Sequence, residues 1–287
     1  MAIPRIHSFH HKETGTWSYV VADPATRMAV IIDPVLDYDA KSGRTSTTSA
    51  DLLIDTIQGN FYQLTWILET HAHADHISAA PMLKKTLGGR IAIGRGITQV
   101  QKVFKPIFNL DADFATDGSQ FDHLFESDEA FSVGDIQARV IATPGHTNDS
   151  VSYLIGDTAF VGDSLFMPDG GSARCDFPGG SAAILYQSVQ RLFTLPDETR
   201  MFVCHDYSPG GREPRCETTV GEQKRKNIHV ASTITETEFI TMRQARDATL
   251  DMPALIIPSV QVNIAAGKFP AAEENSVIYL KIPIDTL

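Results

Sequence analysis

Short apolar runs that end in polar residues recur along the first part of the chain and predict buried strands. These runs lie at residues 17–22, 29–32, 64–68 and 90–93. They are rich in β-branched and aromatic residues and are bounded by turn-forming residues, as is typical of strands. Between the second and third runs, the apolar positions of residues 50–57 recur at helical spacing, and Gly59 follows as a stop. The alternation of strand and helix predicts an α/β fold.

The second part of the chain is richer in predicted strands. We predict strands at 136–142, 151–155, 158–162 and 201–204, and helices near 182–193, 218–229 and 236–248. Residues 100–129 contain five phenylalanines among acidic residues without a clear period, and we interpret them as an insertion over a site. Residues 252–287 carry four prolines but are apolar enough to pack back on the body. We predict one domain over residues 1–287, with a core of about 1–230 and a helical, proline-bearing extension of about 231–287.

Composition narrows the class of protein. The 287 residues are 43% hydrophobic and 21% charged, which is ordinary for a globular protein. The net charge is −11 and the basic residues form no stripe, so we expect no nucleic-acid partner. No apolar stretch approaches the roughly 20 residues that span a bilayer, and the start lacks a secretory signal, so we expect no membrane partner. The three cysteines form no CxxC pair, which favours a reducing compartment, and we expect a cytoplasmic protein.

The strongest chemical signal follows the apolar run at 64–68. His71, His73, Asp75 and His76 fall within seven residues there. Imidazole and carboxylate together suit zinc, iron or manganese better than calcium or magnesium. A polar loop that happens to carry histidines is the alternative. We also expect Asp75 to cap a helix over residues 77–85 that ends at Gly88.

Three further predicted strands each end in a residue that can bind a metal. His146 follows the strand at 136–142, Asp163 follows the one at 158–162, and His205 follows the one at 201–204. A single histidine after a strand is usually a hydrogen-bonded turn residue. Because the pattern repeats, we expect these strand ends to converge with the first cluster at one sheet edge and to form a single metal cleft.

The order HxHxDH, distal His, Asp and last His resembles the metallo-β-lactamase superfamily over residues 15 to 230. The resemblance implies a four-layer αβ/βα sandwich with the metal site at one edge of the two sheets. Most members with all seven residues are two-metal hydrolases, in which a bridging hydroxide attacks a thioester, a lactam or a phosphodiester.

A second resemblance narrows the family. Residues 162–180, His205-Asp206-Tyr207 and residues 217–223 resemble the persulfide dioxygenases, also called sulfur dioxygenases. Residues 209–212 and 261–267 resemble a bacterial subgroup of that family, which oxidises glutathione persulfide. The resemblance implies one Fe(II) per chain in a facial triad, which leaves three adjacent positions open. The implied ligands are His71, His146 and Asp163. The remaining residues would orient these ligands or capture a second metal, and they are His73, Asp75, His76 and His205.

The same resemblance suggests residues that act on the substrate. It places Arg174 near the thiol cosubstrate, where a guanidinium suits a carboxylate such as glutathione carries. The alternative for Arg174 is a structural salt bridge with Asp176. Tyr207 and Arg212 are further candidates for substrate binding. We predict Asp75, His205 and Tyr207 as catalytic residues.

We therefore predict a persulfide dioxygenase that uses Fe(II) and O₂ to oxidise glutathione persulfide to sulfite and glutathione, in sulfide detoxification. The first alternative is a two-metal thioester hydrolase of the glyoxalase II type, with zinc or mixed metals bound by the same seven residues. The second is a metal-storage or redox-sensing protein without enzymatic activity. We also expect a homo-oligomer, specifically a dimer.

Overall fold

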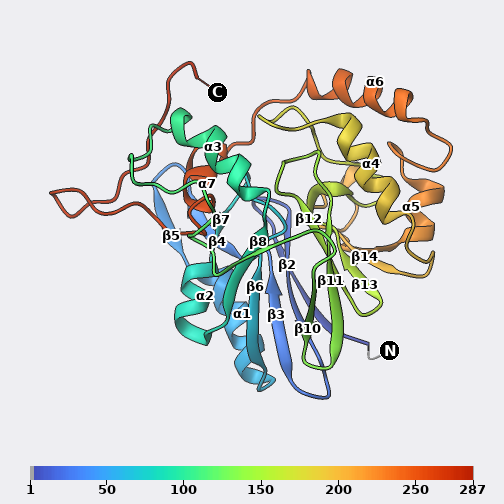
Figure 1. The fold of residues 1–287 in the computed structure, drawn as a ribbon, viewed down its shortest axis with the longest axis horizontal. Helices are drawn as coiled ribbons and strands as arrows, with labels where there is room; N and C mark the ends of the chain where they lie inside the picture. Colours follow the sequence, from blue (N-terminus) through green and yellow to red (C-terminus); the bar gives the residue numbers. More distant parts are fainter. Residues whose placement is uncertain (1–2, 287) are drawn as a thin grey trace.

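A computed structural model describes residues 3–286, in which two six-stranded sheets pack face to face (Figure 1). The strands of the first sheet are, in spatial order, β1 (Arg5–His11), β2 (Thr16–Ala22), β3 (Met28–Ile32), β6 (Gln63–Leu68), β8 (Arg90–Gly94) and β9 (His123–Phe125). Those of the second are β10 (Ala130–Val133), β11 (Ile136–Ala142), β12 (Val151–Ile155), β13 (Thr158–Phe160), β14 (Arg200–Phe202) and β15 (Glu217–Thr219). A small third sheet contains β5 (Arg44–Ser46), β4 (Val35–Asp39) and β7 (Ile77–Ser78).

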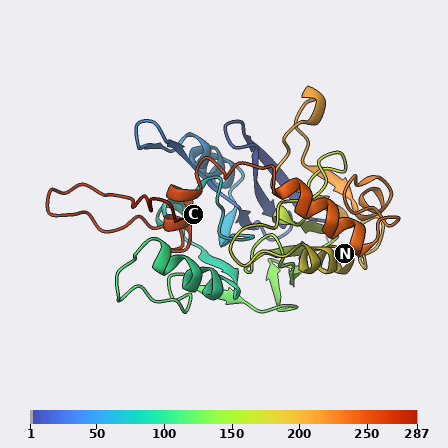
Figure 2. The same ribbon diagram turned by 90° about the horizontal axis from the view of Figure 1, so that it is seen from above.

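Helices cover the outer face of each large sheet (Figures 1 and 2). The first sheet packs against α1 (Thr48–Gly59), α2 (Ala80–Leu87), α3 (Ile97–Ile107) and α7 (Ile256–Asn263). On the side of the second sheet lie α4 (Ala182–Leu192), α5 (Val220–Lys226) and α6 (Glu236–Asp247). A third apolar cluster fills the space between the sheets. This arrangement confirms the predicted four-layer αβ/βα sandwich.

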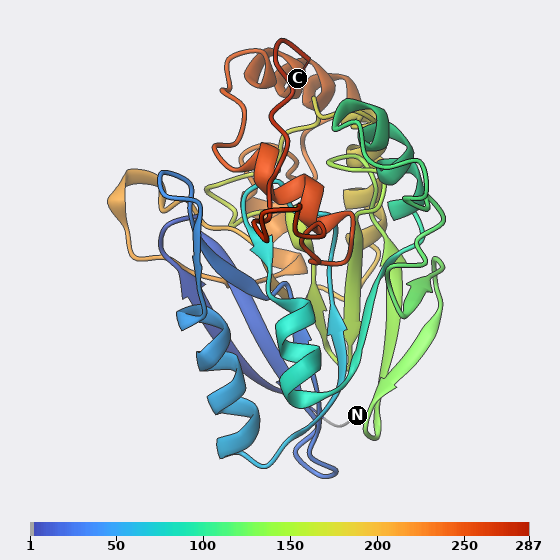
Figure 3. The ribbon, with the colours of Figure 1, turned by 90° about the vertical axis from the view of Figure 1, so that its left-hand side faces the viewer.

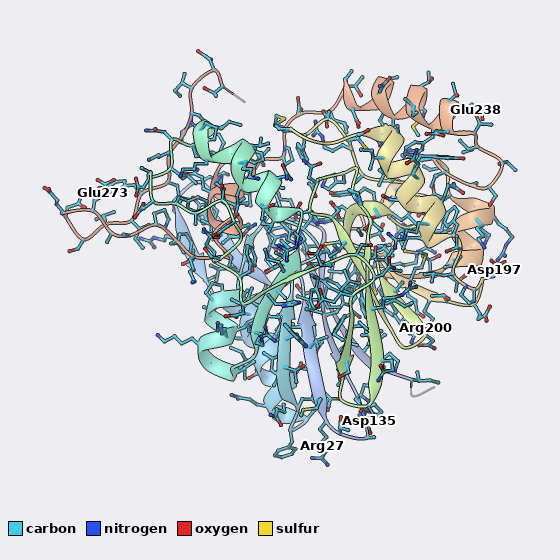
Figure 4. The ribbon with its side chains drawn as sticks, viewed as in Figure 1. Arg27, Asp135, Asp197, Arg200, Glu238 and Glu273 are labelled. Carbon is cyan, nitrogen blue, oxygen red and sulfur yellow. The ribbon has the colours of Figure 1, made fainter. Side chains whose placement is uncertain are left out.

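The direction of the strands determines where their ends meet. In the first sheet, β3, β6, β8 and β9 are parallel. In the second, β13 and β14 are parallel, and β11 runs the same way because β12 is antiparallel to both β11 and β13. Arg27, which precedes β3, and Asp135, which precedes β11, mark the opposite ends of these strands in Figure 4. The carboxyl ends of the strands therefore bring their following loops to one edge.

The helix predicted over residues 77–85 with Asp75 as its cap is wrong at its start. Residues 77 and 78 form β7, which pairs with β4, and α2 begins at Ala80 without a side-chain cap. The Asp75 carboxylate instead accepts a hydrogen bond from Thr16 and contacts His76. Tertiary contacts thus occupy the Asp75 carboxylate, which could otherwise have capped the helix.

Residues 100–129 are not an insertion over the site. Their first part belongs to α3, whose Phe104 is buried in the apolar cluster under the first sheet together with Phe108 and Phe121. Burial of these rings is the reason for the high phenylalanine content. Pro106 near the end of α3 and the irregular chain after it obscured the helical period.

The C-terminal extension packs back on the body over part of its length. α7 lies on the outer side of the first sheet, above α2 in Figure 3, and Ile256, Val260 and Ile264 join the buried cluster there. Beyond Gly267 the chain is largely exposed and projects from the body, with Glu273 near the tip (Figure 4). Among the helices of residues 3–286, none has the length and apolar character that a membrane crossing requires.

The burial of α3 generates a stability prediction. We expect Phe104→Ala to lower the free energy of unfolding by about 3–5 kcal/mol, because it removes a large buried ring and leaves a cavity. The matched control is Phe61→Ala, since Phe61 is 76% exposed whereas Phe104 is 5% exposed, and its effect should stay within about 0.5 kcal/mol. Urea denaturation of both variants measures the difference. Equal stabilities would contradict the packing of α3 described above.

Candidate metal centre

Metal-binding side chains lie in the loops that follow four strands. His71 follows β6, His146 follows β11, Asp163 lies in a short 3₁₀ turn after β13, and His205 follows β14. The turn that presents His146 requires glycine at position 145, where φ is +133° and a Cβ atom would lie 2.3 Å from the Leu185 nitrogen. The predicted convergence at one sheet edge is confirmed.

The structure groups His71, His146 and Asp163 around one point. Their ligand atoms all lie within 4.8 Å of one another. Asp163 Oδ2 is 4.0 Å from His71 Nε2 and 3.6 Å from His146 Nε2. Burial lowers the pKa of His71 far below its usual range, so the imidazole is neutral, which is the form that binds metals.

Unpaired polar atoms at this point fit a metal ion. All three residues are buried, and His71 Nε2 and Asp163 Oδ1 have no hydrogen-bond partner among residues 3–286. Buried polar atoms without a partner are costly, and a bound cation would satisfy them. The donor set, two imidazoles and one carboxylate, suits iron or another first-row transition metal.

Hydrogen bonds behind these residues fix the direction of the two imidazoles. His146 Nδ1 donates to the Arg174 carbonyl oxygen at 2.7 Å, which leaves Nε2 free to bind a metal. His71 Nδ1 lies 3.0 Å from the Thr70 hydroxyl, which in turn donates to Asp33. Such outer partners orient metal ligands and select their tautomer. Asp33 is not among the site residues predicted from the sequence, although it carries the same signal as Asp163, a polar residue that can bind a cation close after a buried strand.

Asp75, His76 and His205 form a second set beside the first. Asp75 Oδ2 lies 3.0 Å from His76 Nδ1 and 3.4 Å from His205 Nε2. His205 Nε2 is also 3.5 Å from Asp163 Oδ1, so Asp163 lies between the two sets. Burial would lower the pKa of His205, but the Asp163 and Asp75 carboxylates outweigh it and raise that pKa to about 10. The second set therefore also favours a cation.

His73 lies between the second set and the buried carboxylate of Asp33. Its Nε2 atom is 2.9 Å from Asp33 Oδ1, and its Nδ1 atom is 4.0 Å from Asp75 Oδ1. It groups with Asp75 and His76, and not with the three residues of the first set. The Asn263 side chain donates to the backbone carbonyls of His73 and His76, and so fixes this loop from α7. The structure thus brings all seven predicted ligand-type residues together.

A large cavity of about 1440 Å³ opens onto the two sets. Tyr207 lies on its wall, and its ring stacks on His205 with the ring centroids 5.7 Å apart. The wall also contains Asp75, His76, His146, Asp163, Phe166, Arg174 and Phe177. Most small-molecule sites measure roughly 300–1,000 Å³, so the cavity has room for a peptide-sized thiol.

Arg174 and Arg212 occupy different surroundings. Arg174 lines the cavity, forms the salt bridge with Asp176 through two 2.6 Å bonds, and donates a third bond to the Asp251 carbonyl. Because a guanidinium has five N–H groups, two remain for a ligand. Arg212 does not line the cavity, and it pairs with Asp169 and Asp206 instead. Its predicted contact with substrate therefore has no support from its position.

Comparison with known proteins identifies the family. Residues 11–205 match the family described as the metallo-beta-lactamase superfamily. Among solved structures, ETHE1 from Myxococcus xanthus is 33% identical with a TM-score of 0.73, and the match covers 92% of this chain and 100% of that one.

The relatives that match this chain in sequence are named for different activities. A beta-lactamase hydrolase-like protein of Agrobacterium fabrum is 52% identical over 100% of this chain, which spans only 66% of that protein's length. Glyoxylase B2 of Dictyostelium discoideum is 49% identical over 99% of this chain and 98% of its own length. The mitochondrial persulfide dioxygenase ETHE1 of Mus musculus is 30% identical over 88% of this chain and 84% of its own length. The chain belongs to the metallo-beta-lactamase superfamily, and its relatives there include persulfide dioxygenases.

Proposed function

We propose that the chain is an Fe(II)-dependent dioxygenase that oxidises the outer sulfur of glutathione persulfide to sulfite. The observation that carries the proposal is the compact group of His71, His146 and Asp163, from which His73 is absent. Two histidines and one carboxylate are the ligand set of non-haem iron oxygenases. The relatives named as persulfide dioxygenases point to the same reaction.

The proposed reaction balances without a further reductant. One persulfide anion, one O₂ and one water give the free thiol, one sulfite dianion and one proton. The outer sulfur loses four electrons and O₂ gains them, while the bond between the two sulfurs breaks and the inner sulfur takes up a proton. Bound Fe(II) would supply redox chemistry and open positions for dioxygen and for the substrate sulfur.

Residues of the chain would bind the substrate and transfer the proton. The cavity would hold the glutathione part, with the free N–H groups of Arg174 directed to a carboxylate. Tyr207, which is 63% exposed beside His205, would donate a hydrogen bond to the substrate. His205, whose raised pKa keeps its imidazole protonated, would donate the proton that the inner sulfur takes up, and Asp75, 3.4 Å away, would hold that imidazolium in place.

A two-metal thioester hydrolase is the second candidate function. Asp75, His76 and His205 lie next to the first set and share Asp163 with it, as a second metal would require. The Dictyostelium relative named glyoxylase B2 points the same way. In this case Asp163 would help to hold the metals together with both sets, the metals would activate water for hydrolysis, and the substrate would be a glutathione thioester.

Oxygen consumption decides between the two candidates. With glutathione persulfide in a sealed cell, we expect the iron-loaded protein to take up one O₂ per sulfite, without NAD(P)H or 2-oxoglutarate. Zinc-loaded protein should be inactive, because zinc has no redox role. An oxygen electrode and a sulfite assay measure the ratio. Brisk hydrolysis of S-lactoylglutathione by the zinc form, without oxygen uptake by the iron form, would establish the hydrolase instead.

The ligand set can be tested through iron content. His71→Ala, His146→Ala and Asp163→Ala should each abolish iron binding, because two remaining protein ligands compete poorly with solvent and with other chelators. His205→Ala should retain one iron per chain. Elemental analysis of anaerobically purified variants measures this. If His205→Ala also loses iron completely, the three-ligand arrangement is wrong.

The substrate role of Arg174 can be separated from that of Arg212. Both arginines pair with aspartates, but only Arg174 lines the cavity. Arg174→Ala should raise the KM for glutathione persulfide roughly tenfold to a hundredfold, since a hydrogen bond to a charged group contributes about 1.5–3 kcal/mol. Arg212→Ala should leave KM near the wild-type value. A lowered melting temperature with unchanged KM for Arg174→Ala would instead support a purely structural salt bridge.

A further inference from the structure

Residues 171–175, next to the centre, form an irregular segment that belongs to none of the helices and sheets within residues 3–286. This segment carries the Arg174 carbonyl that accepts the hydrogen bond from His146. Side chains from other parts of the chain form hydrogen bonds with the backbone of this segment. The Asn227 side chain donates to the Gly171 carbonyl at 3.0 Å, and the Ser172 amide donates to His229 Nδ1 at 3.0 Å. The position of the segment therefore depends on side chains from the C-terminal third of the chain.

Two residues of α6 hold the segment on either side of Arg174. Arg243 Nη1 donates to the Ser172 carbonyl at 3.0 Å. The Cys175 amide donates to Asp247 Oδ2 at 2.9 Å. The contacts thus fix the backbone two residues before Arg174 and the peptide unit that joins Arg174 to Cys175, whose carbonyl points to His146.

Arg243 and Asp247 also form a buried ion pair. Asp247 Oδ1 lies 2.8 Å from Arg243 Nε and 2.6 Å from Nη2, and the side chains are only 1% and 6% exposed. A buried ion pair rarely adds net stability, because the cost of removing both charges from water offsets their attraction. What such a pair does provide is a fixed, directional set of donors and acceptors. Here that set faces the backbone next to Arg174.

We propose that Arg243 and Asp247 are positioning residues for the metal centre, acting through the Arg174 carbonyl on His146. The pair fixes the carbonyl, the carbonyl holds the Nδ1–H of His146, and the Nε2 atom of His146 is thereby directed at the first set. α6 lies outside residues 11–205, the part of the chain that matches the superfamily. The inference rests on the part of the proposed function in which His146 binds a metal, and it holds for either candidate reaction.

The test removes the polar contacts and keeps the volume. The double variant Arg243→Met/Asp247→Leu places apolar side chains of similar size in the buried site, so loss of the ion pair itself should cost little stability, and the unpaired Ser172 carbonyl and Cys175 amide should lower the melting temperature without unfolding the protein. We expect its affinity for Fe(II), measured by competition with a chelator, to fall roughly tenfold to a hundredfold. We also expect the visible absorption of the Co(II)-loaded protein to change, because His146 would take up altered orientations.

Two further variants make the result specific. Asp247→Asn, with Arg243 intact, keeps an acceptor for the Cys175 amide. It should therefore lose no more than half of the Fe(II) binding energy that the double variant loses. Glu222→Gln/Lys226→Met removes an exposed ion pair of the same spacing on α5, with atoms 3.0 Å apart, and should change neither affinity nor spectrum.

Clear results would overturn the inference. A folded double variant with wild-type Fe(II) affinity and an unchanged Co(II) spectrum would do so. So would a loss of binding that only matches the unfolded fraction seen by circular dichroism. Failure of the proposed dioxygenase is distinguishable, because wild-type protein that binds Fe(II) but consumes no O₂ leaves both binding measurements intact.

Discussion

The buried carboxylate of Asp163 imposes the constraint on which the centre depends. It is 6% exposed, and it faces His71 and His146 on one side and His205 on the other. A carboxylate withdrawn from water needs a nearby cation or hydrogen-bond donors to remain charged. An imidazolium at His205, one metal or two metals can each meet that need. The choice among them decides which reaction the same seven residues support.

Hydrogen bonds from two directions orient the histidines of the first set. Asp33 is bonded to Thr70 and contacts His73, so one buried acid orients the loop that carries His71 and holds His73 behind it. On the opposite side, the Arg174 carbonyl orients His146. Asp33 lies outside the cavity wall, whereas His146 and Arg174 are both part of it. The directions of the two imidazoles are thus fixed by hydrogen bonds to their Nδ1 sides, which leaves both Nε2 atoms for a metal.

Much of the fold and of the centre could be predicted because the signals are local. Apolar runs define the strands, and His71, His146, Asp163 and His205 each follow such a run directly. The failures arose where a tertiary contact overrode a local preference, as when Thr16 took up the Asp75 carboxylate and prevented a helix cap. They also arose where partners are distant in sequence, as for Arg243 and Ser172, which are 71 residues apart. Arg174 and Arg212 look alike as sequence, and only their positions relative to the cavity distinguish them.

The contact from Asn263 to the histidine loop has a consequence for biosynthesis. Its side chain satisfies the carbonyls of His73 and His76 across 190 and 187 residues of chain. Until α7 has left the ribosome, those two carbonyls lack their native partner. The loop thus acquires these two native hydrogen bonds only after residue 263 has been synthesised and α7 has formed. A ribosome that stalls before residue 263 leaves the His73–His76 loop without this support.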